Sequence, residues 1–253
     1  MLLVMLPAYN EAGAIAPLLT SIAATFKELD REASVLLVDD GSSDDTIERA
    51  EETARSLGLQ MTVEPHGTNR GLGAALKTGF TRGSEIVGDD GVLVCMDADN
   101  THDPSVIPSM LAKLDEGFDV VIASRYAPGG EEVGLSLLRS ILSRGASLTL
   151  KLFLPVEGAR DYSCGYRAYT GAVLKRGFEA HGADLITETG FVSSAEVLLK
   201  LAYLPSRVSE VPLVLRYDLK GGASKMNITD TIQRYLRMIT AGRKAIRTGK
   251  GTT

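Results

Sequence analysis

Short apolar runs alternate with helical patterns through the first 125 residues, and this alternation limits the possible folds more than any other feature of the sequence. The runs are "LLVMLP", "SVLLVDD", "LQMTVEP", "GVLVCMDAD" and "DVVIASR". Strands that are apolar along most of their length are typical of a parallel sheet that helices cover on both faces. We therefore predict an α/β fold with a mostly parallel central sheet.

Polar residues gather just beyond the carboxyl ends of these runs. In open α/β sheets, ligands bind beyond the carboxyl ends of the strands. The residues at these positions are Pro7, Tyr9, Asn10, Glu11, Asp39, Asp40, Asp97, Asp99 and Arg125. We therefore expect the functional site at an acidic edge of the sheet that contains one arginine.

The net charge and the cysteine content argue against several function classes. A net charge of -5 provides no general attraction to nucleic acid, so a polyanion would have to meet a local basic cluster. Cys95 and Cys164 are far apart and lack the spacing of metal ligands, which indicates a reducing compartment. The sequence has no apolar run of about 18 residues and no signal-peptide pattern at Met1, so we expect no transmembrane segment in this chain.

The alternation of strands and helices changes from about Tyr126 onwards. A long amphipathic segment from Leu135 to Leu154 carries basic residues among leucines. This pattern fits either a core helix or a helix that lies on a bilayer surface with its apolar face down. A basic loop, "LKGGASKM", then precedes a basic amphipathic helix that we expect from Ile228 onwards.

Asp97 and Asp99 place two like charges one residue apart after an apolar run. If the strand continues through both residues, their side chains point to the same side. Two such carboxylates repel each other, and a divalent cation with oxygen ligands removes the conflict. The alternative is an ordinary turn, because Asp and Asn are common after strands.

A set of ordered motifs resembles those of one enzyme family. "PAYNE", "VDDGSSDDT", "NRGLGAAL", "MDADNTHDP" and "SRY" resemble the motifs of inverting GT-A glycosyltransferases of family 2. "LSRGAS", "DYSCGYRAY" and "GGASKM" further resemble the dolichol-phosphate mannosyltransferase branch, the polyprenyl-phosphate sugar synthases. The resemblance covers nearly the whole chain. It implies a Rossmann-like GT-A fold with helices on both faces of the sheet.

The resemblance also implies an activity and a domain organisation. The activity is metal-dependent, inverting transfer of a hexose from a nucleotide-sugar, with GDP-mannose favoured, to a polyprenyl or dolichyl phosphate. The cofactor is Mg²⁺ or Mn²⁺. The catalytic domain spans residues 1–227, with a nucleotide-binding half at 1–125 and an acceptor-side half at 126–227, and a basic helix and tail follow at 228–253. The protein would lie on the cytoplasmic face of a membrane as a peripheral protein.

Site residues follow from the matching positions of the motifs. The predicted catalytic residues are Asp97, Asp99 and Arg125, and the first two are the predicted metal ligands. The predicted nucleotide-sugar site consists of Pro7, Tyr9, Glu11, Val38, Asp40, Asp97, Ala98, Asp99, Arg125, Arg216, Lys220 and Lys225. The predicted ligands of the acceptor phosphate are Arg125, Arg139 and Ser143.

Some positions depart from the family pattern or have a second interpretation. Thr101 stands where some members carry a glutamine that helps to hold the metal, and either Arg216 or Lys220 matches the arginine of the C-terminal loop. Glu196 either contacts the acceptor or sugar, or is a surface carboxylate of a helix. Two other functions remain open: a family 2 transferase with a UDP-sugar and another acceptor, and a non-catalytic module that binds nucleotide-sugars.

Overall fold

The computed structural model describes residues 1–220 and 228–247, and for residues 137–139, 228–229 and 241–247 it describes the backbone only. The central sheet has the order β3-β2-β1-β4-β7-β5-β8. Its strands are β1 (Leu2–Ala8), β2 (Ala33–Asp39), β3 (Met61–Pro65), β4 (Val92–Cys95), β5 (Val120–Ser124), β7 (Arg167–Thr170) and β8 (Val208–Pro212). Strand β7 runs antiparallel to β4 and β5, whereas the other neighbours are parallel. The predicted α/β fold with a mostly parallel sheet is confirmed.

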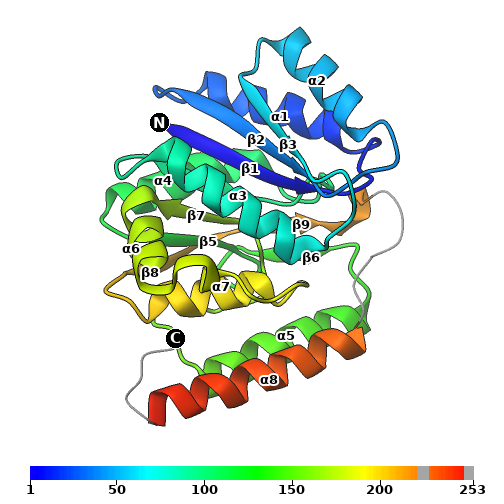
Figure 1. Ribbon diagram of the computed structural model, residues 1–253. Helices are drawn as coiled ribbons and strands as arrows, with labels where there is room; N and C mark the ends of the chain where they lie inside the picture. Colours follow the sequence, from blue (N-terminus) through cyan, green and yellow to red (C-terminus); the bar gives the residue numbers. More distant parts are fainter. Residues whose placement is uncertain (221–227, 248–253) are drawn as a thin grey trace.

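Helices cover both faces of this sheet (Figure 1). One face carries α1 (Ile15–Lys27), α2 (Thr46–Leu57) and α4 (Ile107–Asp115). The other face carries α3 (Leu72–Val87), α6 (Gly171–His181) and α7 (Ser193–Ala202). The short 3₁₀ turns η1 (Pro104–Val106), η2 (Gly182–Leu185) and η3 (Tyr217–Leu219) complete these layers.

The core forms around β1, in which all seven residues are buried. Helix α3 packs closely on this strand because its inner face is built from small residues. A Cβ added to Gly79 would lie 2.7 Å from Sδ of Met5, and one added to Gly83 would lie 2.8 Å from Cδ1 of Leu93. The glycine-rich sequence of α3 therefore serves helix–sheet packing, since larger side chains would push the helix away from the sheet.

Two features of the strands position the site. Strand β4 ends at Cys95, so Asp97 and Asp99 lie on the following turn and not in the strand. The run from Val208 divides at Leu213 into β8 and β9 (Val214–Arg216), and β9 pairs in parallel with β6 (Glu131–Val133) in a separate small sheet. This division brings the segment after β9 back over the carboxyl edge of the central sheet, since the backbone N–H of Arg216 donates to the carbonyl of Thr101 at 3.0 Å.

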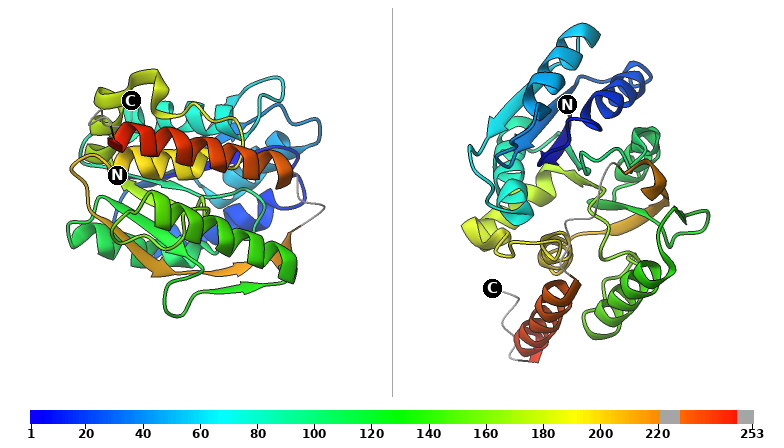
Figure 2. Two further views of the ribbon diagram at one scale, coloured as in Figure 1. Left: turned by 90° about the horizontal axis from the view of Figure 1, so that it is seen from below. Right: turned by 90° about the vertical axis from the view of Figure 1, so that its right-hand side faces the viewer.

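Helices α5 (Leu137–Phe153) and α8 (Ile228–Arg247) lie side by side at the end of the molecule opposite to α1 and α2 (Figures 1 and 2). Several large apolar side chains of this pair are exposed: Ile141, Leu148, Leu152, Phe153, Ile232 and Leu236. Within the described part of the chain, no helix combines the length and the apolarity that crossing a bilayer requires.

Candidate active site at the carboxyl edge of the sheet

The acidic pair lies on a turn whose hydrogen bonds fix its shape. The backbone N–H of Asp97 donates to Nδ1 of His102 at 3.2 Å, and the imidazole of His102 stacks on Tyr166. Oδ1 of Asp99 accepts from both the N–H and the hydroxyl of Thr101, at 3.2 and 2.7 Å. Both carboxylates line the same two pockets. The turn therefore brings them to the same side, as we expected from a continuous strand.

The two carboxylates have different protonation behaviour. Burial raises the pKa of Asp97, and the nearby charge of Asp99 raises it further. Burial also disfavours the charged form of Asp99, but Lys220 outweighs it and the pKa of Asp99 is lowered. Lys220 does so by direct contact, with its Nζ 2.5 Å from Oδ2 of Asp99. The pair thus has one member whose ionised form is favoured by its counter-ion Lys220, and one, Asp97, for which the nearby cations only partly offset burial.

The first pocket, of about 370 Å³, extends from the ends of β1 and β2 to the acidic pair. Among the residues that line it are Pro7, Tyr9, Glu11, Asp40, Asn69, Gly71, Asp97, Ala98, Asp99, Lys220 and Arg234. Carboxylates at one end suit the N–H and hydroxyl groups of a nucleoside, and a cation site at the other end suits a diphosphate.

Asp40 is held rigidly at the end of this pocket that lies next to β1 and β2. Its carboxylate accepts hydrogen bonds from the backbone N–H groups of Arg70 and Gly71, at 3.0 and 2.8 Å. His66 lies 2.8 Å from the same carboxylate through Nδ1 and 2.9 Å from the hydroxyl of Thr78 through Nε2. Since the side chains of Asp40 and His66 are only 4% and 5% exposed, this arrangement fixes the loop before α3.

Glu196 supports a wall of the first pocket but lines neither pocket. Its carboxylate accepts from the backbone N–H groups of Thr187 and Glu188, both at 2.9 Å, and from Nζ of Lys200 at 2.7 Å. The loop that it holds contributes Thr189, Gly190 and Phe191 to the pocket. The structure therefore places Glu196 beneath this loop, where it lines neither pocket and, at 6% exposure, is not a surface carboxylate either.

The same loop packs tightly against the start of α3. The N–H of Gly73 donates to the carbonyl of Thr189 at 3.1 Å. A Cβ on Gly73 would lie 1.9 Å from the carbonyl oxygen of Glu188, so only glycine permits this approach. The loop also bonds to α8, since Nη1 of Arg234 lies 3.1 Å from Oε2 of Glu188.

The second pocket, of about 210 Å³, opens on the other side of the acidic pair and is mostly apolar. Its apolar walls come from β9, from the helix pair and from the segment just before α5: Leu215, Leu142, Ala146, Ile232, Tyr235 and Leu135. Its polar end contains Arg125, Ser143, Ser163 and His102. The two pockets share Asp97, Asp99, Phe191, Lys220 and Thr231. Two pockets therefore meet at the acidic pair: charged groups near β1, β2 and α8 line the first, and apolar side chains of the helix pair line the second.

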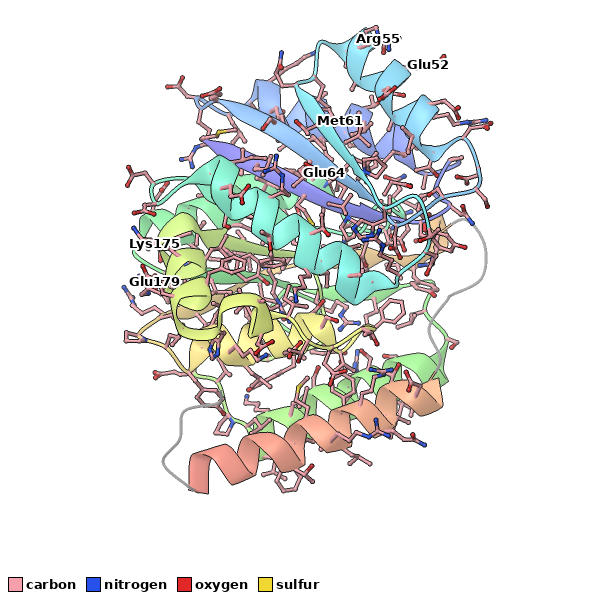
Figure 3. All side chains as sticks on the ribbon, viewed as in Figure 1. Glu52, Arg55, Met61, Glu64, Lys175 and Glu179 are labelled. Atoms are coloured by element: carbon pink, nitrogen blue, oxygen red, sulfur yellow. The ribbon has the colours of Figure 1, made fainter. Side chains whose placement is uncertain are left out.

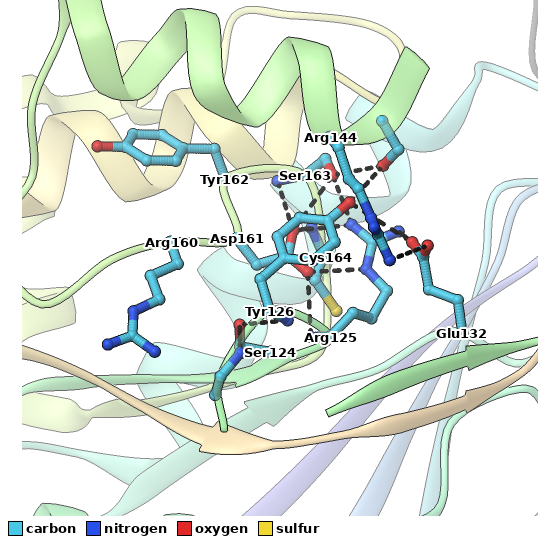
Figure 4. Close-up of polar contacts among 12 residues, drawn as sticks. Ser124, Arg125, Tyr126, Glu132, Arg144, Arg160, Asp161, Tyr162, Ser163 and Cys164 are labelled. Carbon is cyan, nitrogen blue, oxygen red and sulfur yellow. Dashed lines mark hydrogen bonds and ion pairs between the residues drawn. The ribbon is translucent and has the colours of Figure 1, made fainter. Parts of the chain in front are cut away.

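Arg125 is the centre of a hydrogen-bond network at the polar end (Figure 4). Its guanidinium donates to both oxygens of Asp161, to Ser163 at 2.7 Å and to Glu132 at 3.2 Å. The side chain of Asp161 is fully buried and that of Glu132 is 4% exposed. Burial disfavours the charge of Arg125, but Asp161 outweighs burial and raises its pKa. Arg125 is thus a fixed cation with most of its N–H groups already bonded.

Ser143 joins α5 to this network. Its hydroxyl lies 3.2 Å from the hydroxyls of Tyr126 and Ser163. On the neighbouring turn of the helix, the hydroxyl of Ser140 donates to Oε2 of Glu132 at 2.5 Å. The position of α5 is therefore coupled to the groups that surround Arg125.

The remaining predicted residues are distributed unevenly. Val38 is buried in β2 and lines neither pocket, and exposed Arg216 pairs with Asp218 at 2.8 Å outside both pockets. Of the two candidates for the C-terminal cation, the structure thus brings Lys220 to the site. The side chain of Arg139 and all of Lys225 lie outside the described residues.

Several residues at the site do not follow from the sequence argument. Asp161 belongs to the motif "DYSCGYRAY", and its acidic charge next to a predicted arginine-containing site is a signal that could have identified it. His66, Phe191 and Arg234 gave no comparable signal, because their roles depend on loops and on helix packing that bring distant residues together.

The acidic pair fits a divalent cation by its chemistry. The half-buried carboxylate of Asp97 and the buried one of Asp99 line the same cavity, and they are hard oxygen ligands of the kind that Mg²⁺ and Mn²⁺ prefer. Over the described ranges, no third His, Cys, Asp or Glu completes a metal cluster. The hydroxyl of Thr101 is bonded to Asp99 and orients that carboxylate. Phosphate and water oxygens would supply the other ligands, as is usual for Mg²⁺.

A model described as glycosyl transferase family 2 matches residues 3–178. The chain belongs to glycosyl transferase family 2. It is 33% identical to a dolichol-phosphate mannosyltransferase of Pyrococcus furiosus over 237 residues, which are 93% of this chain and 62% of that protein. It is also 33% identical to an undecaprenyl-phosphate mannosyltransferase of Micrococcus luteus, over 89% of this chain and 87% of that protein. These matches confirm the predicted family and branch.

The fold is similar to that of glucosyl-3-phosphoglycerate synthase from Mycobacterium tuberculosis. A structure of that enzyme with Mn²⁺, UDP-glucose and glycerol 3-phosphate matches with a TM-score of 0.61 and 22% identity, over 98% of this chain and 80% of that chain. A second structure, with Mn²⁺, UDP and phosphoglyceric acid, matches with a TM-score of 0.62. The similarity confirms the predicted fold class.

Proposed function

We propose that the protein transfers mannose from GDP-mannose to a polyprenyl phosphate, with inversion and with Mg²⁺ or Mn²⁺ as cofactor. The observation that carries the proposal is that two pockets meet at Asp97 and Asp99, one lined by additional charged side chains and one walled by the helix pair. A nucleotide-sugar fits the first pocket and a phosphorylated isoprenoid fits the second, so the anomeric carbon and the acceptor phosphate would meet at the shared boundary. The names of the mannosyltransferase relatives support this choice of sugar and acceptor.

The donor would bind with its nucleoside between β1 and β2 and its diphosphate near the acidic pair. At the nucleoside end, the carboxylate of Asp40 would accept hydrogen bonds from the nucleoside. His66 and two backbone N–H groups hold this carboxylate in place. At the other end, Asp97 and Asp99 would hold the cation, which stabilises the charge that develops on a departing diphosphate. The Mn²⁺ in similarly folded structures supports this assignment. Lys220 lines the same end and would contact the phosphates.

The acceptor would need positioning more than activation. A phosphate monoester is already anionic near neutral pH, so it can attack without a general base. Ser143 and Ser163 offer hydroxyls at the polar end of the second pocket, and Arg125 supplies a fixed positive charge. Asp161 and Glu132 accept from most of the N–H groups of Arg125. Arg125 would therefore act mainly by orienting the serine hydroxyls and by attracting the acceptor phosphate with its positive charge.

The helix pair α5 and α8 would bring the active site to a membrane. Its exposed apolar residues, such as Leu148 and Leu152 at 69% and 73%, lie on the helices that wall the acceptor pocket. An apolar face of this kind lies favourably at the boundary of headgroups and acyl chains. The protein would then be peripheral on the cytoplasmic face, with its acceptor delivered from the bilayer.

A turnover assay with defined substrates tests the proposal. Purified protein receives GDP-mannose, UDP-glucose or UDP-galactose, each with and without a short polyprenyl phosphate and Mn²⁺. We expect release of GDP that requires both the lipid and the metal, together with a β-linked mannosyl product. Release of UDP from either UDP-sugar, and not of GDP, would instead support a different family 2 transferase. Binding of nucleotide without turnover under any condition would support a non-catalytic module.

A further inference from the structure

The contact between Lys220 and Asp99 occupies the position that a cation needs. Nζ of Lys220 lies 2.5 Å from Oδ2 of Asp99, and the other oxygen of this carboxylate accepts from Thr101. Both oxygens of Asp99 are therefore bonded within the protein. The two side chains are only 19% and 8% exposed, so water screens this ion pair weakly.

A free divalent ion and Lys220 compete for the same carboxylate. Two positive charges bound to one oxygen repel each other strongly at low dielectric, so Lys220 must leave when Asp99 binds a metal ion. Leaving is costly unless the ammonium finds another negative partner, because an unpaired, half-buried charge is unfavourable. The bare ion brings no such partner.

A metal ion that arrives with a nucleoside diphosphate removes this difficulty. Lys220 lines both pockets, so phosphate oxygens beside the acidic pair lie within the space that its side chain borders. It also follows directly after the short turn η3, Tyr217–Leu219, and its Nζ lies 5.5 Å from the ring of Tyr217. The ammonium can therefore exchange one anion for another by a change of side-chain rotamer.

We propose that Lys220 makes the site select the metal–diphosphate complex over the free metal ion. Lys220 neutralises Asp99 while the donor pocket is empty and moves to the phosphates when the donor enters. The inference rests on the proposed function, of which it specifies the binding order: donor and metal bind together, and the metal does not bind first. Lys220 would then determine that the site binds the metal–diphosphate complex in preference to the free metal ion.

Mn²⁺ alone is the probe that tests this proposal. The free Mn²⁺ signal in electron paramagnetic resonance gives the affinity of the wild type and of Lys220→Met without nucleotide. We expect Lys220→Met to bind bare Mn²⁺ about tenfold tighter or more, the range expected when a charge-assisted competitor is removed. Lys220→Arg, which keeps the charge, should bind as weakly as the wild type. Lys220→Gln is a second neutral variant, and circular dichroism establishes that each variant is folded.

Lys175→Met is the matched control. Lys175 forms a pair of the same length with Asp89, at 2.5 Å, but it lies on α6 away from both pockets (Figure 3). Its loss should leave Mn²⁺ affinity unchanged. Equal or weaker Mn²⁺ binding by Lys220→Met would overturn the proposal.

A second measurement detects the exchange itself. GDP should strengthen Mn²⁺ binding by the wild type, and Mn²⁺ should strengthen GDP binding by the same factor. In Lys220→Met this factor should fall, because the bare ion no longer meets a competitor and the phosphates lose a cation. An unchanged factor would contradict the exchange. If Asp99→Asn left Mn²⁺ binding intact, the proposed metal site would be wrong, whereas a failed turnover assay would count against the proposed catalytic function, sugar or acceptor and would leave the Mn²⁺ result unaffected.

Discussion

Arg125 donates through Nε and Nη2 to both carboxylate oxygens of Asp161, at 2.7 and 2.8 Å, where Asp161 has no exposed surface. Asp161 also accepts from the backbone N–H groups of Ser163 and Cys164. The buried pair therefore ties the end of β5 to the loop that forms the polar end of the second pocket. Its integrity controls the geometry of the site as well as stability.

Asp161→Asn should destabilise the protein at neutral pH by about 3–5 kcal/mol, because it leaves the charge of Arg125 buried without its partner. Urea unfolding followed by circular dichroism measures this difference. Glu132→Gln removes the weaker carboxylate contact of Arg125 and should cost clearly less. Equal losses in the two variants would show that the paired geometry of Asp161 has no special importance.

The stability difference between wild type and Asp161→Asn should depend on pH. Burial alone would raise the pKa of Asp161, but Arg125 outweighs it and the pKa is lowered in the folded protein. The stabilisation is then fully present above the unfolded value of about 3.9 and is lost as pH falls through the lower folded value. Unfolding curves should show a constant difference above about pH 5 that shrinks below about pH 4. A difference that grows in acid would contradict this assignment.

His66→Gln should weaken nucleotide binding without preventing folding. The loss of a well-placed hydrogen bond to the carboxylate of Asp40 costs about 1–2 kcal/mol, so the Kd for GDP should rise by about fivefold to thirtyfold. Isothermal titration calorimetry with Mn²⁺ present measures it. Thr78→Val removes only the outer hydrogen bond of His66 and should have a smaller effect. The interpretation fails if the two substitutions act equally.

Arg234→Gln should also reduce donor affinity, because Arg234 links α8 to the loop over the donor pocket through Glu188. Glu188→Gln breaks the same contact from the other side. If the contact matters, the effects of the two substitutions on the Kd for GDP should be similar, and the double variant should be little worse than either alone. Fully additive effects would mean that the two residues act separately.

Leu148→Asp combined with Leu152→Asp should reduce association with vesicles that contain anionic lipid, since both side chains are exposed on α5. Turnover with a long-chain polyprenyl phosphate in vesicles should fall, whereas turnover with a short, water-soluble acceptor should change little. Thr20→Asp with Ser21→Asp adds the same charge to the exposed face of α1 and serves as control. Unchanged vesicle sedimentation of the α5 variant would exclude this face as the contact.

The regular part of the fold could be predicted from the sequence because each strand and helix carries its own pattern. The apolar run that became β1 and the small residues of α3 are examples. The acidic pair was also found, although the turn after Cys95, and not a continuous strand, makes its carboxylates converge. What could not be predicted are contacts across long separations, such as Glu196 beneath the loop at 187–190 or Lys220 on Asp99. These depend on how loops close over the sheet, which local patterns do not encode.

The shared boundary of the two pockets has a consequence for inhibitor design. Under the proposed function, a single molecule that joins a guanosine to a short isoprenoid tail through a diphosphate mimic should occupy both pockets at once, because Asp97, Asp99 and Lys220 border each of them. Linking the two halves makes the second contact intramolecular and raises affinity beyond that of either half. Such a bisubstrate compound would distinguish this enzyme from transferases that share its nucleotide pocket but lack the apolar one.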